Sequence, residues 1–427
     1  MTSNPRQQPA ALVAANDSNG ALAAIRDLGR AGVSVMVPRP TALVPVRFSR
    51  YVASHVEAQP AAAAPDERLA WLMRVGRANP GTVLMPAVDE LTWLIASNQA
   101  ELKAHFRLYY PTPDVLYSFL NKQMLHEDAE AAGLAVPAAW FPPDLKDLDQ
   151  MAPHLTYPVV IKPLAHIGAP SWLKGWLARD AGELRLRYRQ ALTRLAGGPG
   201  DSRDGRWAFV QEYHPNAGRK VYNISGFIDH TGELSGYSAT MKVLQQPQRF
   251  GVGLCFVAAP LDQNLVLGLD RLLRDAGFFG MFEAEFIEVG GRRLLIDFNP
   301  RIFNGLSLPT ARGLRLSLTW YLAALGDWAG VVEQLAASRA AGNDVGRPLA
   351  WCNRTGLRTM VASRLLTGQM GVRETRRWSK WIRSSRARVL DADWEPDDPW
   401  PGRLRGIQHL AGIAIDPRYF VGTFVRD

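Results

Sequence analysis

Short apolar runs alternate with helical patterns over the first part of the chain. The run ALVAA at 11–15 is followed by a polar turn, by a helical spacing of leucine and isoleucine, and by a second apolar run at 33–37. A third run, TVLMP at 82–86, also ends at a polar turn. Strand, helix and strand within about thirty residues make a βαβ unit, and such units build parallel sheets. We therefore predict a small α/β domain over residues 1–112.

Denser strand patterns follow a break at Pro111-Thr112-Pro113. A helical pattern runs from Val115 to Ala132, and short strand patterns then recur between residues 155 and 300. Strands that follow one another this closely leave little room for crossover helices between parallel neighbours. The spacing therefore predicts a largely antiparallel α+β body over residues 113–330.

The remaining residues, 331–427, include a basic stretch. Arginines are frequent between residues 373 and 388, where Trp378 and Trp381 also lie, and an acidic, proline-rich turn, WEPDDPWPG, follows. Two tryptophans in a basic helix would suit an interfacial anchor at a membrane surface or a nucleic-acid face. We favour instead a solvated helix whose aromatic rings pack on the body of the protein.

Composition indicates a globular protein with an anionic partner. Hydrophobic residues make up 47% of the chain and charged residues 21%, which excludes disordered, collagen-like and coiled-coil classes. Lysine and arginine number 49 against 40 aspartates and glutamates, and this formal charge of +9 favours a nucleotide, an acidic metabolite, a membrane surface or nucleic acid. Two cysteines are too few for a disulfide scaffold or a cysteine-rich zinc site.

Membrane-spanning and secretory segments are not predicted. The longest uncharged apolar stretches, 251–261 and 316–326, reach about half of the ~20 residues that a spanning helix needs. The start of the chain makes a poor signal peptide because Asn16 and Asp17 break its short apolar run. We therefore expect a cytoplasmic protein without a transmembrane segment.

Several common signatures are absent from the sequence. It has no GxGxxG after the first strand, no GxxxxGK[ST], no HExxH and no GxSxG. The eight histidines show no metal-ligand spacing. These absences exclude a dinucleotide fingerprint and a P-loop, and they leave nucleophilic triads without support.

The strongest chemical signal is a pair of neighbouring strands that carry carboxylates. Glu283 and Glu285 share one face of the first strand because side chains alternate with a period of two, and Asp297 and Asn299 share a face of the second. A Gly-Gly turn between the strands favours a hairpin that brings these oxygens together. Two carboxylates and an amide are ligands that suit Mg²⁺ on nucleotide phosphates, and Arg301 would hold a transferred phosphoryl group. The alternative is the polar face of an ordinary sheet.

Lysines on or beyond apolar strands form a second signal. Lys162 ends the strand PVVIK, Lys174 follows a loop, and Lys122 lies early in the predicted helix. Lysine is a point charge suited to phosphate, although a single lysine is more often a surface residue. For a substrate, the candidate contacts are Asn16–Gly20, Asp89-Glu90 and Arg249, each of which is as readily a cap, a turn or a surface charge.

The order of these motifs resembles that of the ATP-grasp superfamily, in particular its carboxylate–amine ligase branch with D-aspartate ligase-like enzymes. The motifs, in chain order, are Lys122 in LNKQML, Lys162 in YPVVIKP, FVQEY at 209–213, Glu285, and DFNPR at 297–301. The resemblance spans about residues 10–330 and implies an N-terminal Rossmann-like preATP-grasp domain at 1–112. It also implies an ATP-grasp domain at 113–330, whose two α+β lobes clamp ATP, with a lid subdomain at about 156–212. Residues 331–427 would then be a C-terminal extension.

The resemblance also implies a role for each matching residue. Phosphate contacts are expected from Lys122, Lys162 and Lys174, and contacts with the adenine edge from Gln211, Glu212 and the backbone at His214. The expected Mg²⁺ ligands are Glu285, Asp297 and Asn299, and the expected catalytic residues are Arg301 and Lys242. Mn²⁺ is an expected substitute for the magnesium. Three features depart from the family pattern. Asp297 stands where glutamate is more usual, and the lid loop has a single glycine. Arg219 and Lys220 stand in place of the usual acidic residue that contacts the ribose.

From the residues and the resemblance together we predict an ATP-dependent ligase that joins a small-molecule carboxylate to an amine, of amino-acid or peptide type. The carboxylate would attack the γ-phosphate of ATP, and the amine would displace phosphate from the resulting acylphosphate, with release of ADP. Phosphoryl transfer of this kind needs cations and positioning more than a covalent nucleophile. The alternatives are a phosphotransferase with a hydroxyl acceptor and a non-catalytic nucleotide-binding regulator. No nucleic acid is expected as a partner, and contact with a membrane surface through the basic tail stays open.

Overall fold

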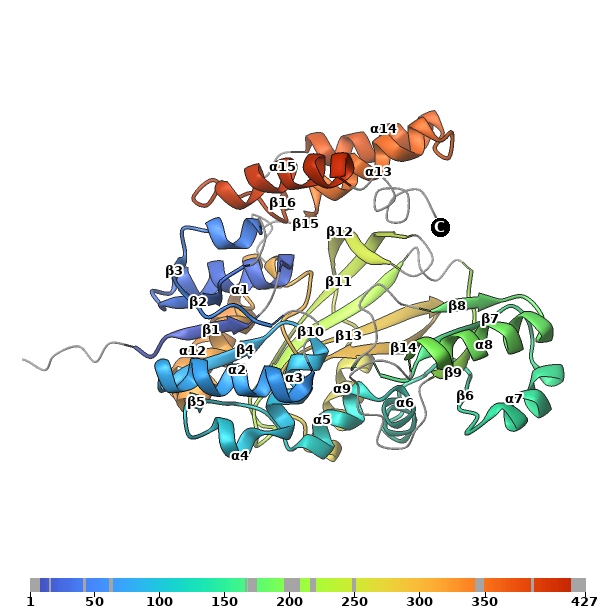
Figure 1. Cartoon of the computed structure of the whole chain (residues 1–427), viewed down its shortest axis with the longest axis horizontal. Helices are drawn as coiled ribbons and strands as arrows, with labels where there is room; N and C mark the ends of the chain where they lie inside the picture. The colour runs from blue at the N-terminus through green and yellow to red at the C-terminus, as the bar shows by residue number, and fades with distance from the viewer. Residues whose placement is uncertain are drawn as a thin grey trace, which may run out of the picture.

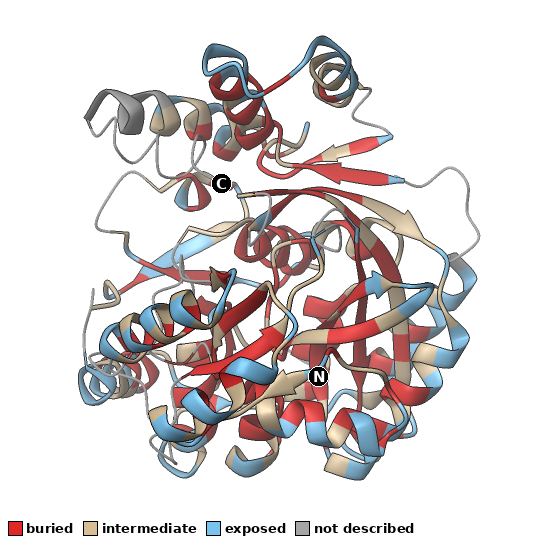
Figure 2. Ribbon diagram, turned by 90° about the vertical axis from the view of Figure 1, so that its right-hand side faces the viewer, coloured by how far each residue is buried: buried red, intermediate tan, exposed pale blue. Residues whose placement is uncertain are grey.

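Three β-sheets and the helices around them make up the described part of the chain (Figure 1). The computed structural model describes residues 8–14, 17–40, 44–60, 64–165, 167, 175–195, 208–215, 220–247, 251–341, 349–384 and 388–415, with side chains of the last helix to residue 409. Lys174, Arg219, Arg249 and the lid loop around residues 168–174 lie outside the described residues. Figure 2 shows that the sheet strands are mostly buried, whereas the outer faces of the surrounding helices are exposed.

The N-terminal sheet has five parallel strands in the order β3-β2-β1-β4-β5. Its elements are β1 (Ala11–Ala14), α1 (Asn19–Arg30), β2 (Val35–Pro38), η1 (Pro45–Phe48), β3 (Val52–Val56), α2 (Pro65–Ala78), β4 (Thr82–Pro86), α3 (Asp89–Ser97), α4 (Gln99–Leu102) and β5 (Phe106–Arg107). Ser18 caps α1, because its hydroxyl accepts a hydrogen bond from the backbone N–H of Ala21. The α/β prediction for this part of the chain is confirmed.

The predicted single helix from Val115 to Ala132 is wrong: the structure has two helices, α5 (Pro113–Leu120) and α6 (Lys122–Ala131). Asn121 separates them, since its backbone is extended and its side-chain oxygen accepts hydrogen bonds from the N–H groups of Gln123 and Met124. The break makes Lys122 the first residue of a helix instead of a residue in its interior.

A four-stranded antiparallel sheet, in the order β6-β9-β7-β8, forms a separate lobe on the far side from the N-terminal sheet (Figure 1). Its elements are β6 (Ala139–Trp140), α7 (Leu145–Met151), η2 (Ala152–His154), β7 (Val159–Pro163), β8 (Trp176–Ala178), α8 (Ala181–Leu195) and β9 (Ala208–Glu212). One face of this sheet packs on α7 and α8 through Val159, Ile161 and Val210. The opposite face carries Lys162 and Gln211, because residues alternate between the faces of a strand.

The third sheet has seven strands in the order β14-β13-β10-β11-β12-β15-β16 and runs between the two other sheets. Its first part consists of β10 (Val221–Ile228), β11 (Ser235–Gln246), β12 (Val252–Ala259), α9 (Gln263–Ala276), β13 (Gly280–Val289) and β14 (Arg292–Asn299). Gly290 and Gly291 both have positive φ, at 56° and 77°, as a tight β13–β14 turn requires. The predicted hairpin and antiparallel body are confirmed. Three helices follow: α10 (Ser307–Ala311), α11 (Leu316–Leu325) and α12 (Trp328–Ala341).

The C-terminal residues extend the same sheet and cover its end. The elements are β15 (Ala350–Cys352), α13 (Arg354–Leu366), α14 (Val372–Arg383), β16 (Val389–Asp391) and α15 (Trp400–Ile415). Trp378 is 2% exposed and packs, with Trp381, in a hydrophobic cluster beside β12 and β15. The interpretation of the basic stretch as a helix whose aromatic rings pack on the body is confirmed.

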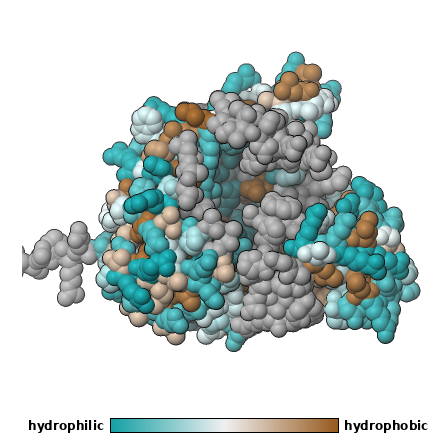
Figure 3. Space-filling model, viewed as in Figure 1, coloured by the Kyte–Doolittle hydropathy of each residue, from teal (hydrophilic) through white to brown (hydrophobic). Residues whose placement is uncertain are grey.

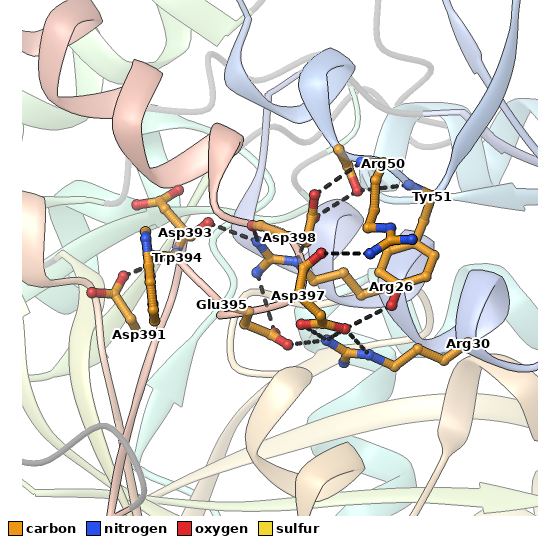
Figure 4. A network of polar contacts seen from close by, with 11 residues as sticks. Arg26, Arg30, Arg50, Tyr51, Asp391, Asp393, Trp394, Glu395, Asp397 and Asp398 are labelled. Atoms are coloured by element: carbon orange, nitrogen blue, oxygen red, sulfur yellow. Dashed lines mark hydrogen bonds and ion pairs between the residues drawn. The ribbon is translucent and has the colours of Figure 1, made fainter.

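The acidic turn between β16 and α15 docks on the N-terminal sheet's helices (Figure 4). Arg26 of α1 is 2% exposed and donates hydrogen bonds to the carboxylate and the carbonyl of Asp398, at 2.9 Å each. Ser49 and the backbone N–H of Arg50 also donate to that carboxylate. The C-terminal segment therefore fastens the seven-stranded sheet to the N-terminal layer. Among the described residues, no helix has the length and apolar character that crossing a membrane would require.

Candidate active site

The β13–β14 hairpin sets the carboxylates opposite one another. Glu285 is the register partner of Asp297, and Glu283 is the partner of Asn299. A register shift follows immediately, since Phe286 pairs with Leu295 and one residue of β14 is left over. Such a bulge bends the strand and changes the direction of its side chains, and it lies between the apolar residues in the middle of β14 and its polar end. The geometry places the three predicted Mg²⁺ ligands at one end of one hairpin.

Two buried lysines neutralise these carboxylates. The Nζ atom of Lys122 lies 2.5 Å from Oδ1 of Asp297, and that of Lys242 lies 2.9 Å from Oε2 of Glu285. The lysines are 4% and 7% exposed. Burial acts to lower the pKa of Lys242, but the carboxylates of Glu285, Glu283 and Asp297 outweigh it and raise that pKa above its ordinary value. Pairing of this kind keeps charges buried that would otherwise be costly.

Lys162 completes the group of cations. It projects from β7 toward the same carboxylates and has no hydrogen-bond or ion-pair partner among the residues that the structure describes. Burial and the positive charges of Lys122 and Lys242 lower its pKa to about 8, against the attraction of Asp297 and Glu285. Three lysines from α6, β7 and β11 thus converge on one hairpin. An ammonium group without a partner in such a place is ready to receive an anion.

Arg301 lies next to this group, held from the N-terminal layer. Its guanidinium forms a bidentate ion pair with Asp89 at the start of α3, with Nη2 3.1 Å from Oδ2, and also donates to Oδ1 of Asn299 at 2.9 Å. Burial acts to lower the pKa of Arg301, and Asp89 outweighs this and raises it. Asp89, which the sequence offered as a substrate contact, therefore positions Arg301. The pair ties the end of β14 to the carboxyl edge of the N-terminal sheet.

The predicted adenine contacts lie on β9 and just beyond it. Gln211 is 2% exposed, and its Oε1 atom has no hydrogen-bond partner within the described part of the chain. Glu212 is already engaged, because its carboxylate accepts a hydrogen bond from the N–H of Ala138 and lies 2.9 Å from Nε2 of His214. A buried carbonyl oxygen without a donor is costly, and an exocyclic amino group would satisfy it. Gln211 is therefore the member of the set that is free to contact a base.

Sequence reasoning gave no role to two residues that the structure brings into the site. Glu283 is 5% exposed and lies 3.3 Å from the side-chain nitrogen of Asn299 and 3.4 Å from that of Asn223. Burial and the nearby Glu285 raise the pKa of Glu283 to about 8. The sequence signal that could have identified Glu283 is its spacing of two residues from Glu285, which places both side chains on the same face of the strand.

The other residue is His126, four positions after Lys122 and therefore on the same face of α6. It is 4% exposed, its Nε2 atom has no partner among the described residues, and its ring lies against those of Phe141 and Phe209. Burial, together with the charges of Lys162 and Lys122, lowers its pKa to about 4. It is a neutral ring between the lysines and the aromatic rings of Phe141 and Phe209. A lone histidine in an amphipathic helix gives no sequence signal for such a place.

The residues fit a magnesium nucleotide by the chemistry of their donors. Carboxylate and amide oxygens of Glu285, Asp297 and Asn299 suit a hard cation, and the lysines suit phosphates. In the described part of the chain, no group of three or more His, Cys, Asp or Glu side chains is placed to hold a metal ion by itself. The candidate metal site therefore consists of two carboxylates, each with a lysine, and an amide.

Comparison with solved structures identifies the fold. The biotin carboxylase–beta-gamma-ATP complex from Campylobacter jejuni has a TM-score of 0.59 at 14% identity, over 76% of this chain and 72% of that chain. The biotin carboxylase domain of Hydrogenobacter thermophilus 2-oxoglutarate carboxylase, with MgADP, ADP and bicarbonate, has a TM-score of 0.58 at 16% identity, over 75% and 70%. L-amino acid ligase from Bacillus licheniformis has a TM-score of 0.56 at 15% identity, over 76% and 77%.

These neighbours have the ATP-grasp fold, and this chain has that fold. The predicted fold class, with parallel and antiparallel sheets in successive parts of the chain, is confirmed. No protein-family model matches the sequence, and no curated protein matches it.

Proposed function

We propose that this protein is an ATP-dependent ligase that joins a small-molecule carboxylate to an amine, of amino-acid or peptide type, through an acylphosphate. One observation carries the proposal: Lys122, Lys162 and Lys242, from three different elements, converge on the carboxylates of Glu285 and Asp297. A structural sheet face would have no need of two buried lysines and a third, half-buried one that has no partner among the described residues. Such a set provides the cations and the metal ligands that phosphoryl transfer from ATP requires.

Each residue has a definite task in this proposal. Lys122 and Lys162 bind the phosphates, Gln211 accepts a hydrogen bond from the base, and Lys174 is proposed to cover the phosphates from the lid. Glu285, Asp297 and Asn299 hold Mg²⁺, with Mn²⁺ as a substitute, and the metal neutralises charge that develops on the transferred group. Arg301 and Lys242 stabilise the phosphoryl group from the acceptor side. Glu212 and His214 shape the hinge beside the base.

Charge balance favours the same assignment. Without nucleotide, the buried lysines and carboxylates compensate each other, as Lys122 does for Asp297 and Lys242 for Glu285. A magnesium nucleotide offers a phosphate to each lysine and a cation to each carboxylate, so both kinds of charge keep a partner. Arg301 stays in place because Asp89 holds it from the other side of the site.

The neighbours support the reaction class. A biotin carboxylase domain in complex with MgADP, ADP and bicarbonate, a biotin carboxylase–beta-gamma-ATP complex and an L-amino acid ligase are among the structures with this fold. We place the protein in the cytoplasm, where ATP is available, and we assign residues 1–112 to acceptor binding, 113–330 to ATP, and 331–427 to an extension.

Hydroxylamine trapping tests the proposal. The protein is incubated with ATP, Mg²⁺ and one carboxylate at a time, drawn from the amino acids and small organic acids, and then in pairs with amines. ADP release that depends on the carboxylate, together with a hydroxamate when hydroxylamine is added, is the expected result. ADP release that yields a stable phosphate ester and no hydroxamate would instead establish a hydroxyl kinase. Nucleotide binding without turnover on any pair would indicate a regulatory protein.

A further inference from the structure

The turn between α13 and α14 carries a cluster of exposed aliphatic side chains. Leu366, the last residue of α13, is 85% exposed; Val372, the first of α14, is 66% exposed; and Leu365 is 47% exposed. We call these three residues the apolar tip. Isolated exposed leucines are ordinary, and Leu267 on α9 is one of them at 62%. Three such residues around one turn are not isolated. Figure 1 shows that α13 and α14 lie at the outer surface of the molecule, and Figure 3 shows hydrophobic atoms on that part of the surface.

Cations line the helix that begins at this tip. The exposed basic residues of α14, here called the basic face, are Arg373, Arg376, Arg377, Lys380 and Arg383. Their spacing of three and four residues places them along one side of the helix. Glu374 is the only acidic residue of α14, and its carboxylate already accepts a hydrogen bond from the indole of Trp378. Within the described part of the chain, none of these five cations forms an ion pair, and the basic face therefore carries a net positive charge.

The opposite side of α14 fixes this orientation. Trp378 is buried, and Trp381 and Ile382 pack with it against β12 and β15. Arg354 of α13 is 4% exposed and donates hydrogen bonds to the carbonyl groups of Ile382 and Ser384. These bonds tie the end of α14 to the start of α13. The helix is thus held with its basic face outward and cannot turn to bury it.

We propose that the apolar tip and the basic face dock this protein on an anionic lipid bilayer. Aliphatic side chains beside arginines and lysines match the two layers of a membrane surface, where acyl chains lie beneath negatively charged headgroups. Nucleic acid fits the surface less well. Its bases would be read by aromatic stacking, but both tryptophans of α14 face the core, and a phosphate backbone would leave the apolar tip uncovered.

Vesicle co-sedimentation of the full chain tests the proposal. Vesicles of phosphatidylcholine alone are compared with vesicles that contain phosphatidylserine at about three parts in ten. Binding to the anionic vesicles only, and its loss when salt is raised from about 0.1 M to 1 M, is the expected result, because the screening length falls from about 10 Å to about 3 Å. Equal binding to both vesicle types, or none to either, overturns the proposal.

Two variants separate the two parts of the surface. Leu366→Ser with Val372→Ser should weaken binding to anionic vesicles by roughly tenfold or more, whereas Leu267→Ser, at an exposed leucine elsewhere, should not. Arg373→Ser with Arg376→Ser and Arg377→Ser should weaken it by roughly a hundredfold. Circular dichroism establishes that each variant is folded.

The same variants discriminate among other partners. Binding of a duplex DNA or RNA probe as tightly as anionic vesicles, with no effect of the Leu366 and Val372 substitutions, would assign the surface to nucleic acid and overturn the proposal. A dimer of the wild type that the same substitutions dissociate, without vesicle binding, would assign it to a second copy of the chain. Neither result bears on hydroxamate formation, which tests the ligase proposal independently.

Discussion

The ammonium group of Lys122 lies 2.5 Å from a carboxylate oxygen of Asp297, although the two residues are 175 positions apart in the chain. Lys242 and Glu285 form a second pair of the same kind at 2.9 Å. Each carboxylate that we propose as a metal ligand is therefore held by a lysine: Lys122, which we propose to bind the phosphates, or Lys242, which we propose to stabilise the transferred phosphoryl group. The metal-site proposal and the phosphate-site proposal are therefore linked. If one of these carboxylates does not bind the metal, the burial of its paired lysine has no functional explanation.

Asp297→Asn should reduce the rate of ADP release by roughly 10²–10⁴-fold, the range seen when a preorganised electrostatic contact is lost. Size is preserved and one charge is removed, so ATP affinity should fall less than turnover, because the metal acts most strongly on charge that develops during transfer. ADP release is measured across a magnesium series, and Mn²⁺ should recover part of the loss.

Asp262→Asn is the matched control. Asp262 also forms an ion pair, with Arg293, but it lies at the start of α9, and asparagine preserves its capping role. This variant should keep wild-type turnover. Near-wild-type turnover of Asp297→Asn at every magnesium concentration would show that the β13–β14 hairpin is not the metal site.

Lys162→Ala should weaken ATP binding by roughly 10- to 150-fold, because one hydrogen bond to a charged group contributes about 1.5–3 kcal/mol. Lys162 has no partner to lose among the described residues, and thus the fold should persist. Nucleotide titration is compared with that of Lys146→Ala, an exposed lysine of α7. Unchanged affinity in a folded Lys162→Ala variant would remove this lysine from the site.

The local sequence pattern was sufficient to predict the sheets and the polar residues at the ends of their strands. Lys162 ends an apolar run, and Asp297 and Asn299 follow one, so their types and positions could be predicted before their neighbours were known. The hairpin that joins Glu285 to Asp297 followed from two glycines. Their roles stay predictions, which the variants above address.

Contacts between distant segments could not be predicted in this way. The pair of Arg301 with Asp89 joins residues 212 positions apart, and that of Arg26 with Asp398 joins residues 372 positions apart. Period and propensity describe neighbours in the chain, whereas these pairs depend on how two layers are docked. The acidic turn was visible as a turn, but nothing local indicated that Arg26 would be buried opposite it.

Burial of a neutral histidine predicts a pH dependence of stability. The pKa of His126 is lowered to about 4 in the folded protein and is about 6.5 when the chain is unfolded. Between these values the unfolded state binds more protons, so the free energy of unfolding should fall as pH falls from 6.5 to 4, by about 2–3 kcal/mol for this residue. His126→Phe, which keeps the ring contacts with Phe141 and Phe209, should lose that part of the slope.

Urea unfolding at pH 7.5 and pH 4.5 measures the effect. His154→Phe, at an exposed position of η2, serves as the control and should keep the wild-type difference between the two pH values. The same difference in His126→Phe as in wild type would mean that the ring is protonated in the folded state.

Removal of the basic face should leave the chemistry intact. Substitution of all five arginines and lysines by serine is expected to keep ADP release within about tenfold, which corresponds to about 1.4 kcal/mol of barrier. The reason is location: these side chains point outward from α14, while the lysines of the proposed active site lie on α6, β7 and β11. Complete loss of turnover in a folded variant would place the acceptor site at the C-terminal extension. Arg386 lies outside the described residues, and Arg388 precedes β16, so neither is part of this variant.

The ion pairs between the C-terminal acidic turn and α1 should contribute unequally to the free energy of unfolding. The contribution of Asp398 should be large and that of the neighbouring Asp397 small. Asp398 is fully buried and accepts hydrogen bonds from Arg26, Ser49 and the backbone of Arg50. In Asp398→Ala the buried guanidinium of Arg26 loses its closest carboxylate, and breaking a buried pair from one side costs about 3–5 kcal/mol. Asp397 pairs with Arg30 at the surface, where the side chains are 40% and 37% exposed. Asp397→Ala should therefore cost no more than about 1 kcal/mol.

Urea unfolding of the two alanine variants, followed by far-ultraviolet circular dichroism, makes the comparison. The two positions are adjacent in the same turn, so differences in backbone conformation and in the unfolded chain are small. Glu395 still lies 3.2 Å from Arg26 in both variants and offers partial compensation, which sets the lower end of the expected range for Asp398→Ala. Equal, small losses in the free energy of unfolding for both variants would mean that the turn contacts the N-terminal layer but does not stabilise it. A large loss for Asp398→Ala alone would establish that the extension locks the N-terminal sheet to the sheet that carries the proposed site.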